Sequence, residues 1–144
     1  MSSSSAIRQL RIALIVVGII FIIGIYSLIM VWPAGWSWNT ATEHGLHNYL
    51  QMILAVYATL GIFLIIASRA PLQNLSLIWF TVWSSVAHAV VMAFQAFGDQ
   101  EQRGHLWGDV PALLIVAAVL AVLTRRAQKS VTSERAPAQR AANL

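Results

Sequence analysis

Charged side chains are almost missing from the central part of this chain. Between Arg11 and Arg69 there is one, Glu43, and between Arg69 and Asp99 there is none. Only 10% of the residues are charged and 58% are hydrophobic, whereas a soluble globular domain carries about 25% charged residues. A water-soluble fold of this composition would expose large apolar patches. The sequence therefore indicates an integral membrane protein, and its 144 residues correspond to one domain.

Four apolar runs are long enough to cross a membrane, which takes about 20 residues in a helix. The runs cover residues 12–32, 46–67, 75–97 and 106–123. The fourth is the weakest because it contains Asp109 and Pro111. The sequence predicts an all-α polytopic membrane protein in which four transmembrane helices form an up-down-up-down bundle over residues 12–124.

The two ends of the chain are polar. Residues 1–11 are predicted to be a disordered N-terminus, and residues 125–144 a basic tail. Residues 128–144 of this tail lack apolar periodicity, so they are expected to be disordered as well.

Basic residues are concentrated on one side of the predicted bundle. Eight of the nine precede the first run, follow the second or follow the fourth, and Arg103 is the one that does not. Since Lys and Arg accumulate on the cytoplasmic side of a membrane, both termini are expected to be cytoplasmic. This distribution accounts for the net charge of +4 without a nucleic-acid partner. The expected partners are the lipid bilayer and, as an option, other membrane protein subunits.

All four histidines fall on the outer side or in the outer half of this bundle. His88 lies nine residues before the end of the third run, about 13 Å inside the membrane. One face of that run carries polar residues and a methionine, namely Thr81, Ser84, Ser85, His88, Met92 and Gln95.

The second run has a matching face, with His44, His47 and Gln51 followed by Ala55 and Ala58. Lipid cannot satisfy hydroxyl, amide or imidazole groups, and small residues let helices approach closely. We therefore expect the second and third runs to pack these faces together around a polar pocket that opens outward. The expected lining residues are His88, Gln51, Ser84, Ser85, Gln95 and Asp109.

Two of these residues have simpler interpretations. Asp109 precedes Val110 and Pro111, a pattern typical of a helix N-cap, and a cap there would leave His105 in a loop, off the face of Asp109. An ionisable group inside a membrane, such as His88, is a candidate functional residue. The alternative for His88 is a neutral imidazole that hydrogen-bonds to Ser, Thr or Gln on another helix.

The histidines also suggest metal or haem chemistry. His44 and His47 lie three residues apart on one helix face, and imidazole pairs of this kind suit Zn, Cu, Fe or Ni. His88 or His105 could complete a three-nitrogen site, and haem held by axial histidines is a second option. No cofactor is required by the sequence.

Three functions are compatible with these residues. A non-catalytic binding, sensor or accessory role is the leading hypothesis, because Ser84 and Ser85 have no carboxylate nearby in sequence that would orient His88 for nucleophilic catalysis. The alternative is a metal- or haem-binding redox or enzyme subunit. The third is transport of a small solute or of protons.

Three segments resemble a family of small bacterial four-helix membrane proteins of unknown function. They are residues 76–88 (SLIWFTVWSSVAH), 103–114 (RGHLWGDVPALL) and 57–61 (YATLG). The resemblance covers roughly residues 11–125 and implies four spans in a bacterial cytoplasmic (inner) membrane. It implies no activity, cofactor or site residue.

Overall fold

The structure, a computed structural model, describes residues 3–24 and 45–142, with side chains for residues 3–24, 51–100 and 103–134. Its four α-helices are α1 (Ser3–Ile19), α3 (Gly45–Ala67), α4 (Leu75–Gly98) and α5 (Asp109–Ala142). The short helical segments are the π-helix η1 (Ile20–Gly24), which continues α1, and the 3-10 helices η3 (Pro71–Gln73) and η4 (Gln100–Leu106), which flank α4. The described residues form no strand, so the all-α prediction is confirmed for them.

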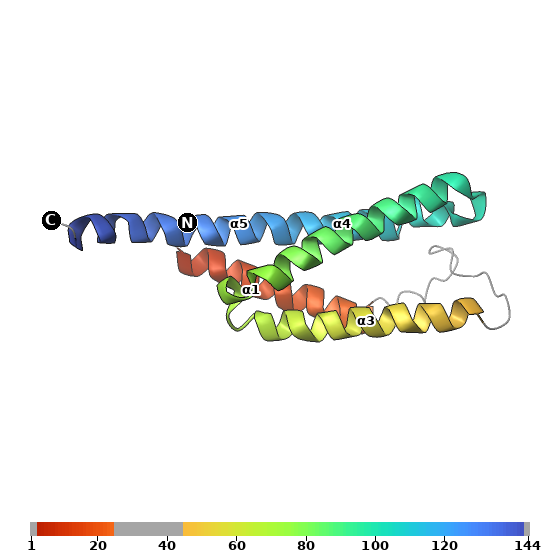
Figure 1. Ribbon diagram of the computed structural model, residues 1–144, viewed down its shortest axis with the longest axis horizontal. Helices are drawn as coiled ribbons and strands as arrows, with labels where there is room; N and C mark the ends of the chain where they lie inside the picture. The colour runs from red at the N-terminus through yellow and green to blue at the C-terminus, as the bar shows by residue number, and fades with distance from the viewer. Residues whose placement is uncertain (1–2, 25–44, 143–144) are drawn as a thin grey trace.

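The helices pair differently from the prediction. α4 lies along α5, and α1 contacts both α3 and α5 (Figure 1). α3 and α4 meet near η3, where the chain passes from one to the other, and diverge from there (Figure 1). The prediction that these two helices pack their polar faces together is therefore wrong over most of their length. The main neighbour of α4 is α5. The buried residues of α4 include Thr81, Ser85 and Met92.

Two glycines explain why α3 packs on α1 instead. A Cβ atom added to Gly61 would lie 2.5 Å from the carbonyl oxygen of Gly18, and one added to Gly18 would lie 2.7 Å from the carbonyl oxygen of Gly61. The two backbones are thus in direct contact, which only small residues permit. The glycines lie in different helices, so no pattern along one helix could reveal that they meet.

The apolar core lies around α1, where it packs against α3 and α5. Its fully buried leucine and isoleucine side chains come from all four helices, and they are Leu10, Leu14, Leu64, Ile78 and Leu120. This core holds the helices together near η3, the end toward which both termini also lie (Figure 1).

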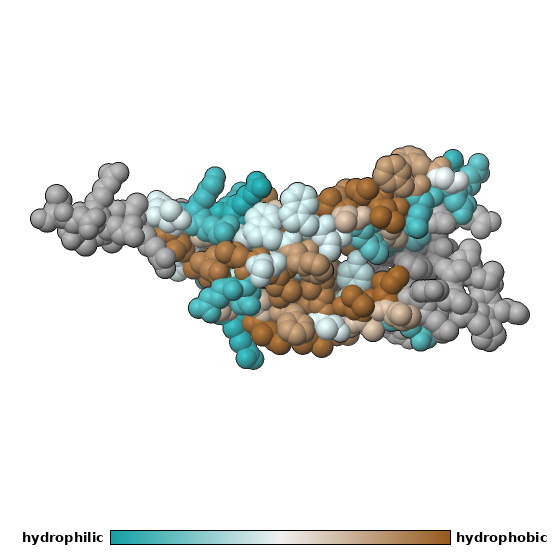
Figure 2. Space-filling view, in the orientation of Figure 1, coloured by the Kyte–Doolittle hydropathy of each residue, from teal (hydrophilic) through white to brown (hydrophobic). Residues whose placement is uncertain are grey.

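Three helical stretches are long and apolar enough to cross a membrane: Ser3–Gly24, Leu75–Gly98 and Arg103–Glu134. The described apolar part of α3, Gln51–Ala67, is shorter. Large apolar side chains such as Phe94, Phe97 and Trp107 are exposed. Hydrophobic residues cover much of the visible face between hydrophilic groups toward the two ends (Figure 2). These features are those of a membrane protein.

The described residues at the two ends of the chain are helical, which corrects the disorder predicted for residues 3–11 and 128–142. α1 begins at Ser3 and α5 continues to Ala142. The backbone amide of Ser3 donates to Oε1 of Glu134 at 3.0 Å, and its hydroxyl donates to Oε2 at 2.5 Å. Ala6 and Ala127 are buried in the same core cluster. These contacts join the start of α1 to α5 across 131 residues of sequence, so no local sequence pattern could reveal them.

Candidate functional site

A cavity of about 490 Å³ lies between α3 and α4, where the two helices diverge. Most of its lining is apolar, and only Tyr57, Ser84 and His88 bring polar atoms. The lining residues are Met52, Ile53, Val56, Tyr57 and Leu60 of α3, and Phe80, Ser84 and His88 of α4. The α3 residues recur at helical spacing of three and four, so they form one stripe along the helix.

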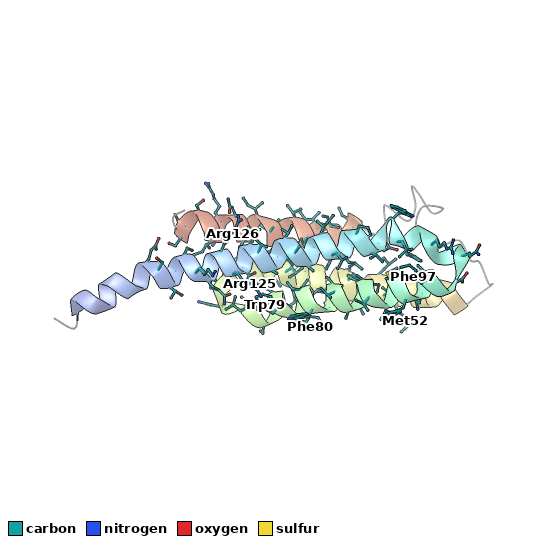
Figure 3. All side chains as sticks on the ribbon, turned by 90° about the horizontal axis from the view of Figure 1, so that it is seen from above. Met52, Trp79, Phe80, Phe97, Arg125 and Arg126 are labelled. Carbon is teal, nitrogen blue, oxygen red and sulfur yellow. The ribbon has the colours of Figure 1, made fainter. Side chains whose placement is uncertain are left out.

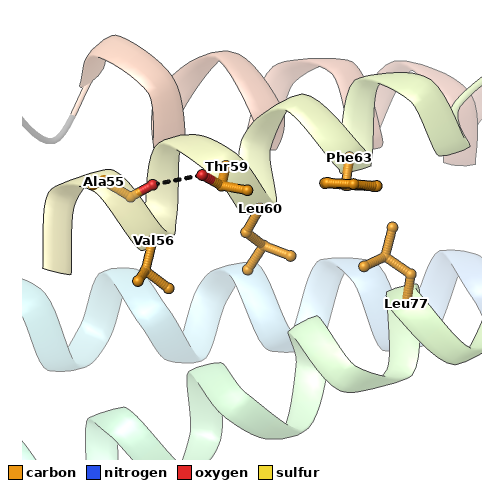
Figure 4. A pocket seen from close by; sticks show the side chains of 6 residues that line it. All are labelled: Ala55, Val56, Thr59, Leu60, Phe63 and Leu77. Carbon is orange, nitrogen blue, oxygen red and sulfur yellow. Dashed lines mark hydrogen bonds between the residues drawn. The ribbon is translucent and has the colours of Figure 1, made fainter. Parts of the chain in front are cut away.

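A second cavity, of about 400 Å³, adjoins the first along α3, and Figure 4 shows the residues that line it. It shares Val56 and Leu60 with the first and adds Ala55, Thr59, Phe63 and Leu77. The Thr59 hydroxyl donates to the carbonyl oxygen of Ala55 at 2.9 Å, so this polar group is already satisfied (Figure 4). The two cavities form one apolar groove, which we call the α3–α4 groove. From Met52 to Phe63 it is about 16 Å long at 1.5 Å per helical residue.

Tyr57 and His88 face each other across the wider part of the groove. Their rings meet edge to face with centroids 5.8 Å apart, and the Tyr57 ring makes a similar contact with Phe21 at 5.0 Å. Among the described residues, no hydrogen bond reaches the Tyr57 hydroxyl or the His88 imidazole. Polar groups within an apolar membrane region are normally hydrogen-bonded. These two therefore have hydrogen-bonding capacity to offer a molecule in the groove.

His105 and Asp109 form a buried pair behind this site. Their side chains are hydrogen-bonded through Nδ1 and Oδ2, and the residues are 6% and 8% exposed. Asp109 is close enough for its charge to act on both Tyr57 and His88. Tyr57 and His88 line the wider cavity, and the pair of His105 and Asp109 acts on them electrostatically without lining it.

This pairing corrects the interpretation of Asp109 as a cap with His105 off its face. The amide of Gly108 donates to the carbonyl oxygen of Gly104 at 3.1 Å, a helical bond that spans the junction between η4 and α5. Because the chain keeps turning in the helical sense there, residues four apart lie on one side. α5 begins at Asp109 itself, three residues later than the start predicted for the fourth run.

The other predicted pocket residues are divided by the structure. Ser84 and His88 line the groove, and the Ser84 hydroxyl also donates to the carbonyl oxygen of Thr81 at 3.2 Å. Ser85 is buried but is not among the lining residues, and Gln51 and Gln95 are exposed outside the groove. Gln51 and Gln95 point outward because the contact between α3 and α4 on which their assignment relied does not form.

Tyr57 is the functional candidate that the sequence analysis missed. It lies on the apolar stripe of α3, not on the face of His47 and Gln51 that was predicted to meet α4. The sequence feature that could have indicated it is a tyrosine in the middle of an apolar run, with no polar neighbour on its own helix face.

The predicted metal ligands do not form a cluster within the described residues. No three His, Asp or Glu side chains there lie close enough to hold one ion. His44 lies outside the described residues, and His47 is in α3 but its side chain is outside them. The metal and haem hypotheses thus stay predictions that depend on these two residues.

Comparison with known proteins gives a family but no activity. A family of unknown function, DUF6632, matches residues 4–142 of the chain. Neither a curated protein nor a solved structure matches the chain.

Proposed function

Because the chain belongs to this family of unknown function, we propose a role for it from the geometry of the molecule. The protein binds a lipophilic molecule with a small uncharged polar head in the α3–α4 groove. The role is that of a non-catalytic binding or sensor protein. The observation that carries the proposal is the pair formed by Tyr57 and His88, two polar groups without hydrogen-bond partners among the described residues in an otherwise apolar groove.

The shape of the groove supports a ligand with a long apolar tail. From Tyr57 to Phe63 the groove runs about 9 Å at 1.5 Å per helical residue, which fits an extended chain of roughly seven carbons, and its walls there include Leu60, Phe63 and Leu77. The groove is also open at its side. Met52 and Val56 are 63% and 68% exposed, so a molecule dissolved in the bilayer reaches the groove without crossing water.

The charges around the groove favour an uncharged head. No Lys or Arg lines it, so no cation there would neutralise an anionic head. A carbonyl oxygen can accept hydrogen bonds from the Tyr57 hydroxyl and from an imidazole N–H of His88. A quinone or a long-chain alcohol has this combination of head and tail.

The proposal includes the placement in the membrane. We infer four spans, with α3 as the fourth in addition to the three long apolar helices, and with both termini on the cytoplasmic side of a bacterial inner membrane. Support comes from Arg8, Arg11, Arg69, Arg125 and Arg126, which belong to the segments expected on that side.

Binding of a labelled short-chain quinone and of a labelled hexadecanol to the protein in lipid nanodiscs tests the function. We expect saturable binding of at least one of them. His88→Ala and Tyr57→Phe each remove one hydrogen bond and should weaken it about tenfold. Gln95→Ala changes an exposed polar residue of the same helix outside the groove and should leave affinity unchanged. Absence of saturable binding of both probes to the unmodified protein would contradict the proposal.

The metal and haem hypothesis has a separate test. Protein purified from metal-replete cells is measured by elemental analysis and by absorption spectroscopy. Stoichiometric metal or a Soret band that is lost in His47→Ala would support it, and absence of both would remove it.

A further inference from the structure

Basic side chains gather at the end of the molecule near η3, away from the wide part of the groove. Those described are Arg8 and Arg11 of α1, Arg69 between α3 and η3, and Arg125, Arg126 and Lys129 of α5. Arg125 and Arg126 are labelled in Figure 3. The apolar parts of α3, α4 and α5 end or begin here, at Ala67, Leu75 and Thr124 respectively. The basic groups thus lie at the depth where lipid head groups meet the hydrocarbon layer.

Part of this charge is used inside the protein. The Arg11 guanidinium donates to the carbonyl oxygens of Ser68 at 2.9 Å and of Arg69 at 3.2 Å, so it satisfies the C-terminal end of α3. Glu134 is the one described carboxylate at this end, and it accepts both hydrogen bonds of Ser3. No carboxylate among the described residues neutralises Arg125 or Lys129.

Arg125 is held over an aromatic ring. Its guanidinium carbon lies 5.6 Å from the ring centroid of Trp79 on α4 (Figure 3), within the range of a cation–π contact. Lys129 follows one helical turn later on the same face of α5. Trp is enriched at the membrane interface, where its ring packs among head groups. The three side chains form a patch with two positive charges above an aromatic surface.

We propose that Arg125, Lys129 and Trp79 form a binding site for the phosphate of an anionic phospholipid, separate from the α3–α4 groove. The charges of Arg125 and Lys129 complement the phosphate, and Trp79 holds the Arg125 guanidinium in place. Because the patch borders the apolar surface of α4 and α5, a lipid bound there keeps its acyl chains against the hydrophobic exterior. A soluble anion would lack that second contact.

The experiment compares retention of two lipids. The full chain is purified from nanodiscs that contain equal amounts of dioleoylphosphatidylglycerol and dioleoylphosphatidylcholine, and the lipid that stays bound in mild detergent is counted by native mass spectrometry. We expect at least a fivefold preference for phosphatidylglycerol. The double variant Arg125→Gln with Lys129→Gln should lose it, and Arg125→Lys, which keeps the charge, should retain most of it.

Arg103→Gln is the matched control, because it removes an exposed positive charge at the opposite end of α4 and α5. It should keep the full preference. No preference in the unmodified protein would overturn the proposal, as would an equal loss in Arg103→Gln. Displacement of phosphatidylglycerol by millimolar inorganic phosphate would assign the patch to free anions and also overturn it. Far-UV circular dichroism of every variant confirms that it is folded.

Discussion

α3 meets its two neighbours in opposite ways. On the side of α1 its backbone touches the partner backbone at Gly61 and Gly18, and Leu64 is fully buried. On the side of α4 a groove separates the helices, and its walls remain accessible. The first contact holds the helix, and the second leaves room for a molecule. A helix fixed on one side can keep a groove open on the other, which is what a binding site on rigid elements requires.

The largest effect should come from breaking the close contact between α1 and α3. In Gly61→Leu the new side chain would start 2.5 Å from the Gly18 carbonyl oxygen, so the two backbones must separate. We expect a loss of at least about 3 kcal/mol in the free energy of unfolding. Gly98→Leu adds the same side chain where nothing lies within 4 Å, and it should change stability by less than about 0.5 kcal/mol. Equal effects in a denaturant titration would refute the contact.

The next effect separates the two sides of α3 directly. Leu64→Ala leaves a cavity in the core and should cost about 2–4 kcal/mol. Leu60→Ala, one turn earlier, removes a side chain that lines the groove and is only partly buried against the core, so it should cost about 1–2 kcal/mol less than Leu64→Ala. Thermal unfolding of the two variants in the same detergent compares them. A cost for Leu60→Ala as large as that for Leu64→Ala would mean that the groove is packed shut.

A smaller effect is expected at the buried pair beside the groove. Asp109→Asn removes the carboxylate that pairs with His105 and leaves the buried His105 imidazole with a weaker partner. The free energy of unfolding should fall by about 1–2 kcal/mol. Gln95→Ala is the control, because Gln95 is an exposed polar residue near the C-terminal end of α4. Unchanged unfolding temperatures for both variants would indicate that the pair contributes nothing to stability.

The smallest effect on stability should accompany a large effect on binding. Val56 lines both cavities and is exposed, so Val56→Trp fills the groove without disturbing the core. We expect stability to stay within about 0.5 kcal/mol and binding of the labelled quinone or alcohol to be lost. Ile62→Trp, at an exposed position of α3 outside the groove, should bind as the unmodified protein does. Undiminished binding in Val56→Trp would exclude the groove as the site.

The sequence predicted the helices better than their pairing. Charge-free runs of about 20 residues indicate helices, because a segment that crosses lipid has to satisfy its backbone hydrogen bonds within itself. The choice of partners depends on contacts such as Gly18 with Gly61, which are 43 residues apart and leave no periodic signal. For the same reason Gln51 was assigned to a pocket from which it points away, and Tyr57 was overlooked.

The remaining differences between the predicted and the observed site depend on the local path of the chain. The pair of His105 and Asp109 depends on a continuous helical turn through Gly104 and Gly108, and Asp followed by Pro is also the pattern of an ordinary helix start. His88 and Ser84 were identified because a polar face within an apolar helix has to be directed away from lipid. Such polar residues identify a face of one helix, but they do not indicate which helix lies opposite that face.

The α3–α4 groove as a ligand site is tested most directly by locating a bound molecule. A long-chain alcohol that carries a diazirine near its hydroxyl group is photolysed in nanodiscs with the protein, and the labelled residues are identified by peptide mass spectrometry. The proposed function predicts labelling concentrated at Met52–Tyr57 and at Ser84–His88, and competition by excess unlabelled alcohol. Labelling spread evenly over lipid-facing residues such as Phe94, Phe97 and Trp107, without competition, would contradict it.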